Sequence, residues 1–393
     1  MPFAISHGAR IYWRQDGAAD KPALVLLTSI GTDLSLYDPV VPLLTPDFRV
    51  LRMDTRGHGA SDAPSGDYSL DLLADDVLAV MDAAGVDRAS IAGTSLGGMI
   101  AMALAPKTPE RVAALILACT SPAMDPSVWD QRLALIRKEG MAPLVEPVMG
   151  RFFSDPFRSQ HPDVVETVRA GMLAQNPDGY RGCGAAIRDM ALLAGLPKIT
   201  APTLVVTGAL DAATPFEGHG DRIVAAIPGA RHTEVGCAHL PSLEAPTAFA
   251  GAIRAFVGEV LSGTAVREAK DALFEAGLKT RRKVLGDAWV DKSLAKRTHF
   301  TADYQAMITR YAWNEIWSRP GLDHRTRRLL VLAICASLAR WEEFRLHVKA
   351  GLEQGGFTQD ELKETLMQLA IYAGVPAANT AFGEAEEVMS RLG

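Results

Sequence analysis

The stretch Ala92-Gly93-Thr94-Ser95-Leu96-Gly97-Gly98 decides the fold of this chain. It follows a short apolar run and precedes a helix-like run, residues 99–105. A strand, then Gly-x-Ser-x-Gly, then a helix is the pattern of a nucleophile elbow, where a serine sits on a sharp, strained turn. The residues two before and two after that serine must be small, and Gly93 and Gly97 meet this need. The five-residue pattern recurs by chance, so the flanking strand and helix carry the prediction.

Apolar runs on both sides of the elbow predict a mainly parallel sheet. Residues 22–27, 48–53, 112–118 and 202–208 are short and largely apolar, as expected for buried strands, and residues 232–235 are expected to form a final strand. Residues 1–20 predict an antiparallel strand pair that turns at Gly8, and residues 70–84 predict an amphipathic helix. The fold class is therefore α/β.

Two further residues follow predicted strands in an order that suits a serine nucleophile. Asp211 comes just after the strand 202–208, and His239 lies in the loop after the last strand. Because a serine hydroxyl is a poor nucleophile at neutral pH, His239 must remove its proton, and Asp211 must orient the imidazole. The order Ser95, Asp211, His239 is that of α/β-hydrolases. With a serine at the elbow, we expect cleavage of an ester, lactone or thioester.

Two loops complete the predicted hydrolase site. The backbone N–H groups of Ile30 and Leu96 are expected to form the oxyanion hole. A plain strand-to-helix loop around Ile30 is the alternative. Residues 54–61 read D-x-R-G-H-G-x-S and resemble the loop that many α/β-hydrolases carry at this position. His58 in that loop precedes the nucleophile in the chain, so we expect it to hold the loop together by hydrogen bonds.

Residues 122–197 change in periodicity and predict a helical cap over the active site. The segment is helical, rich in Met and Arg, interrupted by prolines, and too long for a loop in a compact domain. Trp129 and Arg132 are the candidates for binding a substrate carboxylate, with Arg137 and Arg188 as further possibilities. Each one alone is more often a packing residue or a solvated charge.

The last third of the chain predicts a separate all-α unit. Ser262-Gly263-Thr264 reads as a linker, so the expected domains are 1–262 and 263–393. Thr358 and Glu361 form a capping-box pattern. About six helices are expected there, at residues 267–285, 301–319, 325–340, 342–354, 358–374 and 376–392.

Four runs in this unit resemble a known family, 4-carboxymuconolactone decarboxylase, over nearly all of residues 267–393. These runs are 282–286 (RKVLG), 311–322 (YAWNEIWSRPGL), 341–347 (WEEFRLH) and 371–377 (IYAGVPA). Asn314 stands where the family pattern carries a glycine. The first two-thirds of the chain resemble 3-oxoadipate enol-lactonase. The resemblance implies a fusion of enzymes for two consecutive steps of protocatechuate breakdown, in the β-ketoadipate pathway.

Within the resemblance, His347 is the titratable group expected to protonate the dienolate that decarboxylation leaves. Glu343 lies one helical turn earlier and could orient it; a surface ion pair is the plain alternative. Arg328 and Arg340 are the candidates for the substrate's two carboxylates. Arg325 and Arg327 are weaker candidates. A related peroxidase family with this fold has Cys-x-x-Cys where this chain has Arg340 and Glu343, so dithiol chemistry is excluded.

Composition narrows the remaining functional classes. The net charge of −6 gives no reason to expect nucleic-acid binding, and no apolar run looks long enough to span a membrane. Four scattered cysteines and no visible signal peptide predict a cytoplasmic protein with reduced thiols. We expect no cofactor and no metal, small lactone substrates, and a homo-oligomer formed through the helical unit.

Three alternatives remain open. The chain could be a general carboxylesterase with an unrelated helical appendage, which would cleave neutral esters and release no carbon dioxide. The helical unit could serve only in oligomerisation. The hydrolase could be a catalytically dead binding protein, although Ser95, Asp211 and His239 are all present.

Overall fold

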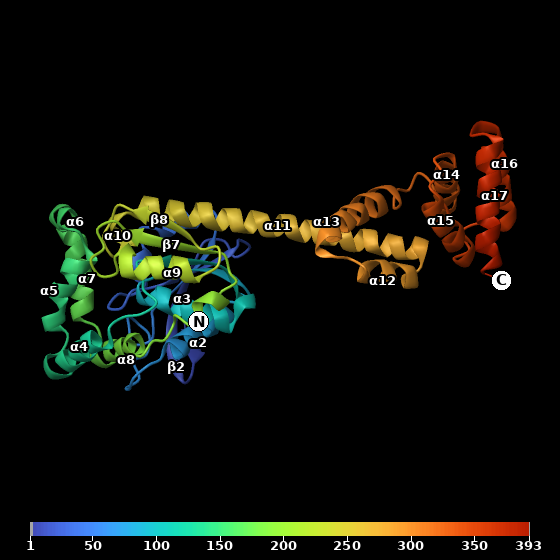
Figure 1. The fold of residues 1–393 in the computed structure, drawn as a ribbon. Helices are drawn as coiled ribbons and strands as arrows, with labels where there is room; N and C mark the ends of the chain where they lie inside the picture. Colours follow the sequence, from blue (N-terminus) through green and yellow to red (C-terminus); the bar gives the residue numbers. More distant parts are fainter. Residues whose placement is uncertain (1–2, 393) are drawn as a thin grey trace. The chain divides into compact units, whose positions relative to one another are not determined.

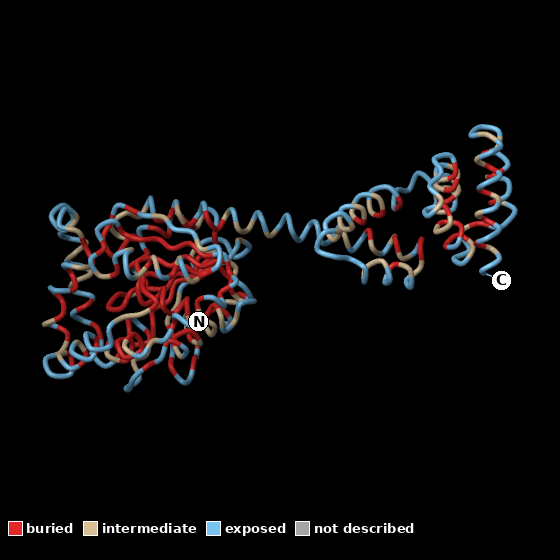
Figure 2. The backbone as a smooth tube through the Cα atoms, in the orientation of Figure 1, coloured by how far each residue is buried: buried red, intermediate tan, exposed pale blue. Residues whose placement is uncertain are grey.

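The computed structural model describes residues 3–392 and divides into two compact units, Met1–Ser262 and Gly263–Gly393. Figure 1 shows a sheet flanked by helices in the first unit and helices alone in the second. The expected α/β-hydrolase fold with a helical cap, followed by an all-α domain, is confirmed. Burial is concentrated on the sheet in the first unit and on the facing sides of the helices in the second (Figure 2).

The first unit is built on an eight-stranded sheet of order β1-β2-β4-β3-β5-β6-β7-β8. β1–β2 and β2–β4 pair antiparallel, and every other pair is parallel. The parallel strands inside the sheet are buried on both faces, which explains their apolar sequences, whereas β8 at the edge is polar and mostly exposed. The strands are β1 Phe3–Ser6, β2 Ala9–Asp16, β3 Ala23–Leu27, β4 Arg49–Met53, β5 Ala89–Thr94, β6 Val112–Ala118, β7 Thr203–Gly208 and β8 Arg231–Val235.

Helices and short turns connect these strands. α2 begins with Ser69 as its N-cap, whose side chain accepts a hydrogen bond from Leu72 N–H. The connecting elements are η1 Leu34–Tyr37, α1 Val41–Leu44, α2 Leu70–Ala83, α3 Leu96–Lys107, η2 Pro109–Arg111, η3 Leu196–Lys198, η4 Phe216–Gly220, α9 Asp221–Ala226 and α10 Pro241–Glu244.

Five helices inserted between β6 and β7 form the cap, within the predicted limits of 122–197. Prolines stand in the first turn of each, where a missing N–H costs nothing, so the sequence breaks the segment into short helices. They are α4 Pro126–Glu139, α5 Ala142–Phe152, α6 Asp155–Gln160, α7 Pro162–Leu173 and α8 Pro177–Arg188.

The second unit has two apolar clusters. One includes Leu332, Phe344 and Leu366; the other includes Val284, Trp313 and Trp317. The capping box of Thr358 and Glu361 is confirmed. The helices are α12 Asp287–Ala295, α13 His299–Ile308, η5 Thr309–Ile316, α14 His324–Ser337, α15 Trp341–Glu353, α16 Gln359–Tyr372 and α17 Val375–Ser390. The helix α12 was not anticipated, and η5 is a π-helix, a form often found at functional sites.

The segment at residues 262–264, which was expected to link the two units, is helical. A single helix, α11 Pro246–Leu285, runs through these positions. Ser262 and Gly263 are weak helix formers but do not forbid a helix, and the residues on both sides favour one.

The same helix corrects a second expectation. α11 contains an 18-residue window with a mean hydropathy of 1.3, so by length and composition alone it could cross a membrane. A single helix of this kind is weak evidence, because core helices of soluble proteins pass the same test. Phe249, Ile253 and Val257 of α11 are buried in the core of the first unit.

Candidate active sites

Ser95 occupies the turn between β5 and α3, with a left-handed backbone (φ 55°, ψ −114°). Only four non-glycine residues among those described have positive φ. Its N–H donates to Ala118 O at 2.9 Å, and its carbonyl accepts from Thr120 Oγ1 at 2.7 Å. These bonds hold the strained turn that the sequence predicted.

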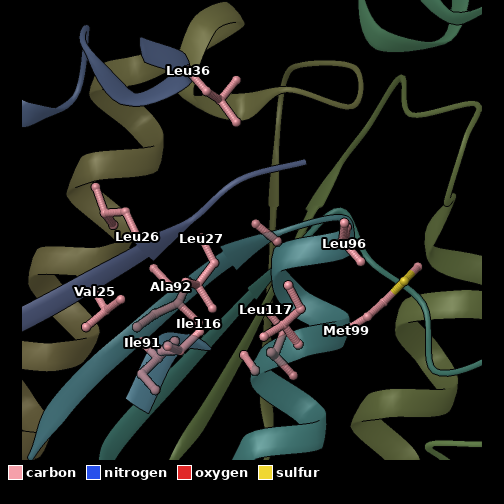
Figure 3. Packing of buried hydrophobic residues seen from close by; sticks show 14 of the residues in the cluster. Val25, Leu26, Leu27, Leu36, Ile91, Ala92, Leu96, Met99, Ile116 and Leu117 are labelled. Atoms are coloured by element: carbon pink, nitrogen blue, oxygen red, sulfur yellow. The ribbon is translucent and has the colours of Figure 1, made fainter. Parts of the chain in front are cut away.

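The glycines around Ser95 have no room for a side chain. A Cβ on Gly93 would lie 2.2 Å from Gly97 O, and a Cβ on Gly97 would lie 2.2 Å from Leu27 O. The predicted need for small residues at both positions is therefore confirmed. Figure 3 shows the apolar packing of Leu27, Leu96 and neighbouring side chains that presses α3 against the strands.

Asp211 and His239 are brought together by the ends of β7 and β8. His239 Nδ1 lies 3.0 Å from Asp211 Oδ2 and 3.1 Å from Oδ1. Thr214 Oγ1 donates to Asp211 Oδ2 at 2.9 Å, and Ala213 N–H donates to Oδ1 at 2.8 Å. Burial alone would raise the pKa of Asp211, but His239 and these donors outweigh it and hold the pKa well below its usual value. The carboxylate stays ionised, so His239 carries its proton on Nδ1 and turns Nε2 away from Asp211.

The loop that carries His239 is tied to the cap. His239 N–H donates to Phe152 O at 3.2 Å, and the ring of Phe152 stacks on the imidazole with centroids 5.5 Å apart. Glu244 accepts from Ala238 N–H at 3.0 Å and also from the Ser154 hydroxyl. Glu244 was not anticipated from the sequence, because its role comes from contacts between distant segments.

Ser95 and His239 open into one cavity of about 220 Å³. Ile30, Trp129 and Arg132 also line it, so five of the predicted hydrolase residues meet there. Among the described residues, no hydrogen bond joins Ser95 to His239. Such a bond is often long in an enzyme without substrate and shortens when the substrate binds.

The loop beside Ile30 is held by His58. The next residue, Gly31, donates its N–H to His58 Nε2 at 2.9 Å. Burial lowers the pKa of His58 to about 4, so the ring is neutral at neutral pH and Nε2 can accept this bond. The expectation that His58 holds its loop by hydrogen bonds is confirmed. Leu96 is buried as the first residue of α3, which places its N–H at the helix N-terminus beside Ser95.

The cap places two arginines at the cavity. Arg132 lies over the ring of Trp129, 4.5 Å from its centroid, and Arg151 lines the same cavity. Burial, and then the charge of Arg132, lower the pKa of Arg151. Arg151 was missed, because the sequence does not show which face of a cap helix turns towards the cavity.

Two other cap arginines lie elsewhere. Arg137 is exposed, and Arg188 forms ion pairs with Asp67 and Asp189 at 3.0 and 2.6 Å. Neither lines the cavity.

In the second unit, His347 is buried in α15 and stacks on Trp317, with ring centroids 5.9 Å apart and planes 3° apart. Its Nδ1 has no hydrogen-bond partner in the described part of the chain. Burial lowers the pKa of His347 to about 4; Arg328 lowers it further and Glu343 acts in the opposite direction. In the protein without substrate the imidazole is therefore neutral at neutral pH, because the ring has left water and faces a cation.

Arg328 is the only one of the predicted decarboxylase arginines that the described structure buries. Its Nη2 donates to Val284 O at 2.5 Å, and its Nη1 has no partner within residues 3–392. Arg340 and Glu343 are exposed on α15 and its N-cap. No hydrogen bond joins Glu343 to His347 among the described residues, and Arg340 is exposed whereas Arg328 is buried, so the roles of Glu343 and Arg340 stay predictions.

The two weaker candidates are also engaged elsewhere. Arg325 pairs with Glu361, and Arg327 donates to the carbonyls of Leu322 and Arg319. Within residues 3–392, no group of three or more His, Cys, Asp or Glu could hold a metal ion.

Comparisons with known proteins agree with this division. A model of the α/β hydrolase fold matches residues 22–246, and that of the carboxymuconolactone decarboxylase family matches residues 302–387. The chain is 32% identical to 3-oxoadipate enol-lactonase 2 of Acinetobacter baylyi over 240 residues, which cover 61% of this chain and 90% of that protein. It is 44% identical to 4-carboxymuconolactone decarboxylase of the same organism over 120 residues, 30% of this chain and 89% of that protein.

A solved structure supports the hydrolase assignment. The enol-lactonase from Burkholderia xenovorans LB400 superposes with a TM-score of 0.64 at 35% identity, over 65% of this chain and all of that one. The chain thus belongs to the α/β-hydrolase fold family in its first unit and to the carboxymuconolactone decarboxylase family in its second. It is an enzyme that joins a hydrolase of the enol-lactonase type to a decarboxylase unit.

The low pKa of His347 predicts a pH effect on stability. The folded pKa of about 4 lies below the ordinary 6.5, so the unfolded chain binds more protons between these values. Stability should therefore fall as the pH drops from 6.5 to 4, by about 3 kcal/mol from this group. Urea unfolding of the second unit, in wild type and in His347→Gln, measures it. A stability difference between the two that does not change with pH contradicts the prediction.

Proposed function

We propose that this enzyme catalyses two consecutive reactions of the β-ketoadipate pathway. The second unit decarboxylates 4-carboxymuconolactone to 3-oxoadipate enol-lactone, and the first unit hydrolyses that lactone to 3-oxoadipate. The observation that carries the hydrolase half is the buried Asp211–His239 pair, whose His239 lines one cavity together with Ser95 and two arginines. The relatives of both units support the pairing of activities.

The hydrolysis follows from the geometry of the first unit. His239 takes the proton of Ser95 as Oγ attacks the lactone carbonyl carbon. The ring C–O bond then breaks, and the leaving enol oxygen takes the proton from His239, after which the enol becomes a ketone. A water molecule, activated by His239, cleaves the acyl-Ser95 ester. The N–H groups of Ile30 and Leu96 hold the oxyanion, and loss of one such donor typically costs about 3 kcal/mol of barrier.

Arg132 and Arg151 are proposed to bind the carboxylate of the lactone. Neither forms an ion pair with an acidic residue within the described chain, although both line the cavity. A guanidinium binds a carboxylate through two parallel hydrogen bonds, which fixes the orientation of the lactone ring against Ser95. A general carboxylesterase for neutral esters would not need two such cations in its cavity.

This assignment predicts a change in selectivity. Arg132→Gln and Arg151→Gln should each lower kcat/KM for the anionic lactone by roughly 10- to 100-fold, the usual contribution of a hydrogen bond to a charged group. Cleavage of p-nitrophenyl acetate should change by less than about threefold, because this neutral ester has no carboxylate for the arginines to bind. Arg137→Gln, exposed on the same helix as Arg132, is the control and should leave both rates unchanged. Equal losses on both substrates would contradict carboxylate binding.

The decarboxylation needs an electron sink and a proton donor. The departing carboxylate is conjugated with the lactone carbonyl, so the C–C electron pair moves into a dienolate as carbon dioxide leaves. Because the substrate supplies the sink, no cofactor is required. Arg328, whose Nη1 is free within the described chain, can stabilise the dienolate oxygen, and His347 can protonate its carbon. A bound dicarboxylate beside His347 would raise its pKa from about 4 towards neutrality and load it with a proton.

One feeding experiment tests both halves. With 4-carboxymuconolactone, wild type should form 3-oxoadipate, and Ser95→Ala should release carbon dioxide but accumulate the enol-lactone. His347→Ala should release little carbon dioxide yet hydrolyse added enol-lactone at the wild-type rate. Chromatography of the products measures all three. If His347→Ala keeps full decarboxylation, this imidazole is not the proton donor, which is the result expected if the second unit serves only in oligomerisation.

We also propose that the chain forms a homo-oligomer through its second unit. Phe300, Ile371 and Tyr372 are 92, 78 and 82% exposed, which is unusual for large apolar side chains of a monomer. An apolar cavity of about 680 Å³ lies between α14 and α16, next to Tyr372. A second copy of the same surface would cover these residues.

Light scattering should therefore give a multiple of 42.1 kDa for the full chain. Tyr372→Glu should lower the mass, because a charge would be buried without a partner. Ile5→Glu, exposed on β1 of the first unit, is the control and should leave the mass unchanged. A monomer mass for wild type contradicts the proposal.

A further inference from the structure

A second arginine of the helical unit is buried without a carboxylate. Arg281, near the C-terminal end of α11, is 4% exposed. Its Nη2 donates to Ser293 Oγ at 3.1 Å, and both terminal nitrogens lie 3.4 Å from Gln305 Oε1. Its Nε has no partner, and no ion pair to Arg281 is found within residues 3–392. A full positive charge is thus surrounded by neutral oxygens.

The buried arginines of the first unit, in contrast, are paired with carboxylates. Arg56 forms a two-point ion pair with Asp76, at 2.5 and 2.8 Å, and Arg52 pairs with Asp16 at 2.9 Å. Burial of a cation is strongly unfavourable unless an anion compensates its charge. Burial lowers the pKa of Arg281, and the nearby cation Arg297 lowers it further. The site therefore favours an added anion.

Arg281 is connected to His347 by a row of aromatic rings. Its guanidinium lies 5.2 Å from the ring centroid of Trp289 and 6.0 Å from that of Trp313. Trp313 stacks on Trp317 at 5.2 Å, and Trp317 stacks on His347 at 5.9 Å. The row thus has the Arg281 guanidinium at one end and the His347 imidazole at the other, with two tryptophan rings between them.

We propose that Arg281 binds the carboxylate that the decarboxylase substrate retains in the product. This inference rests on the proposed function. The substrate has one carboxylate that leaves as carbon dioxide and one that the product retains, and Arg281 is assigned to the second. A cation that holds the departing carboxylate would stabilise the ground state and slow its conversion to neutral carbon dioxide. The departing group is better placed away from a strong cation, and that cation belongs to the group that keeps its charge. Arg281 takes the place expected for Arg340.

The test compares the substrate with its monomethyl ester at the retained carboxylate. In wild type, esterification should lower kcat/KM for carbon dioxide release by roughly 10- to 100-fold, mainly through KM. In Arg281→Gln the free acid should already show this loss, and esterification should add less than about threefold. Arg281→Lys keeps the charge without the fork and should lie between the two. If esterification lowers kcat/KM in Arg281→Gln by as large a factor as in wild type, the proposal is wrong.

The neighbouring Arg282 provides a matched control. It lies next to Arg281 on α11, but it is partly exposed and pairs with Asp287 and Asp291 at 3.0 and 2.6 Å. Arg282→Gln should keep the wild-type response to esterification. An equal loss in Arg282→Gln would show that any charge removed from this helix turn acts through structure, and would overturn the proposal.

A binding measurement separates this inference from the proposed reaction. In the full chain carrying Trp129→Phe, adipate should change the tryptophan fluorescence saturably, because four of the remaining tryptophans lie in the second unit. Adding Arg281→Gln should weaken adipate binding at least tenfold, and adding Arg282→Gln should not. If wild type releases no carbon dioxide but adipate binding needs Arg281, the reaction is wrong and the carboxylate site stands. If Arg281→Gln leaves the affinity for adipate unchanged, the proposed carboxylate site at Arg281 is wrong.

Discussion

The close contact between β5, α3 and β3 at Ser95 is the constraint on which the hydrolase depends. The backbone of α3 comes so near to β5 and β3 that two glycines have no room for a Cβ. This approach forces Ser95 into a left-handed conformation and exposes its hydroxyl at the carboxyl edge of the sheet. The other site residues come from loops after neighbouring parallel strands, which end at the same edge. The order of the strands in the sheet is therefore enough to bring Asp211, His239 and Ile30 close to Ser95.

That dependence explains which parts of the site were predictable. The elbow, the acid and the base follow strand ends, and strand ends can be recognised from short apolar runs and turns. Arg151 and Glu244 were not predicted, because they reach the site through helix packing in the cap and between distant loops. The cap boundaries could be read from its prolines, but the face that each cap helix turns inward could not.

In the helical unit, spacing alone was a poorer guide. Glu343 and His347 are one turn apart, yet only His347 faces the core, since the turn of α15 that carries Glu343 reaches solvent. The pKa of His347 could not be read from sequence either, because it depends on Trp317 and Arg328, which belong to other segments. Similarly, Ser-Gly-Thr suggested a linker, while the flanking residues sustain a helix. Local preference was outweighed by its context in each case.

The continuous helix α11 has a consequence for the gene fusion. Residues 262–272 within it are mostly exposed on every side, so this stretch is held by its own backbone hydrogen bonds and little packing. A cut there would leave two frayed ends with uncapped N–H and C=O groups. The downstream piece would also lose the preceding turns that support Arg281. If the gene were split into two independent enzymes, the shortened helix would need a new N-cap residue at its beginning. A stop codon at the boundary would not be sufficient.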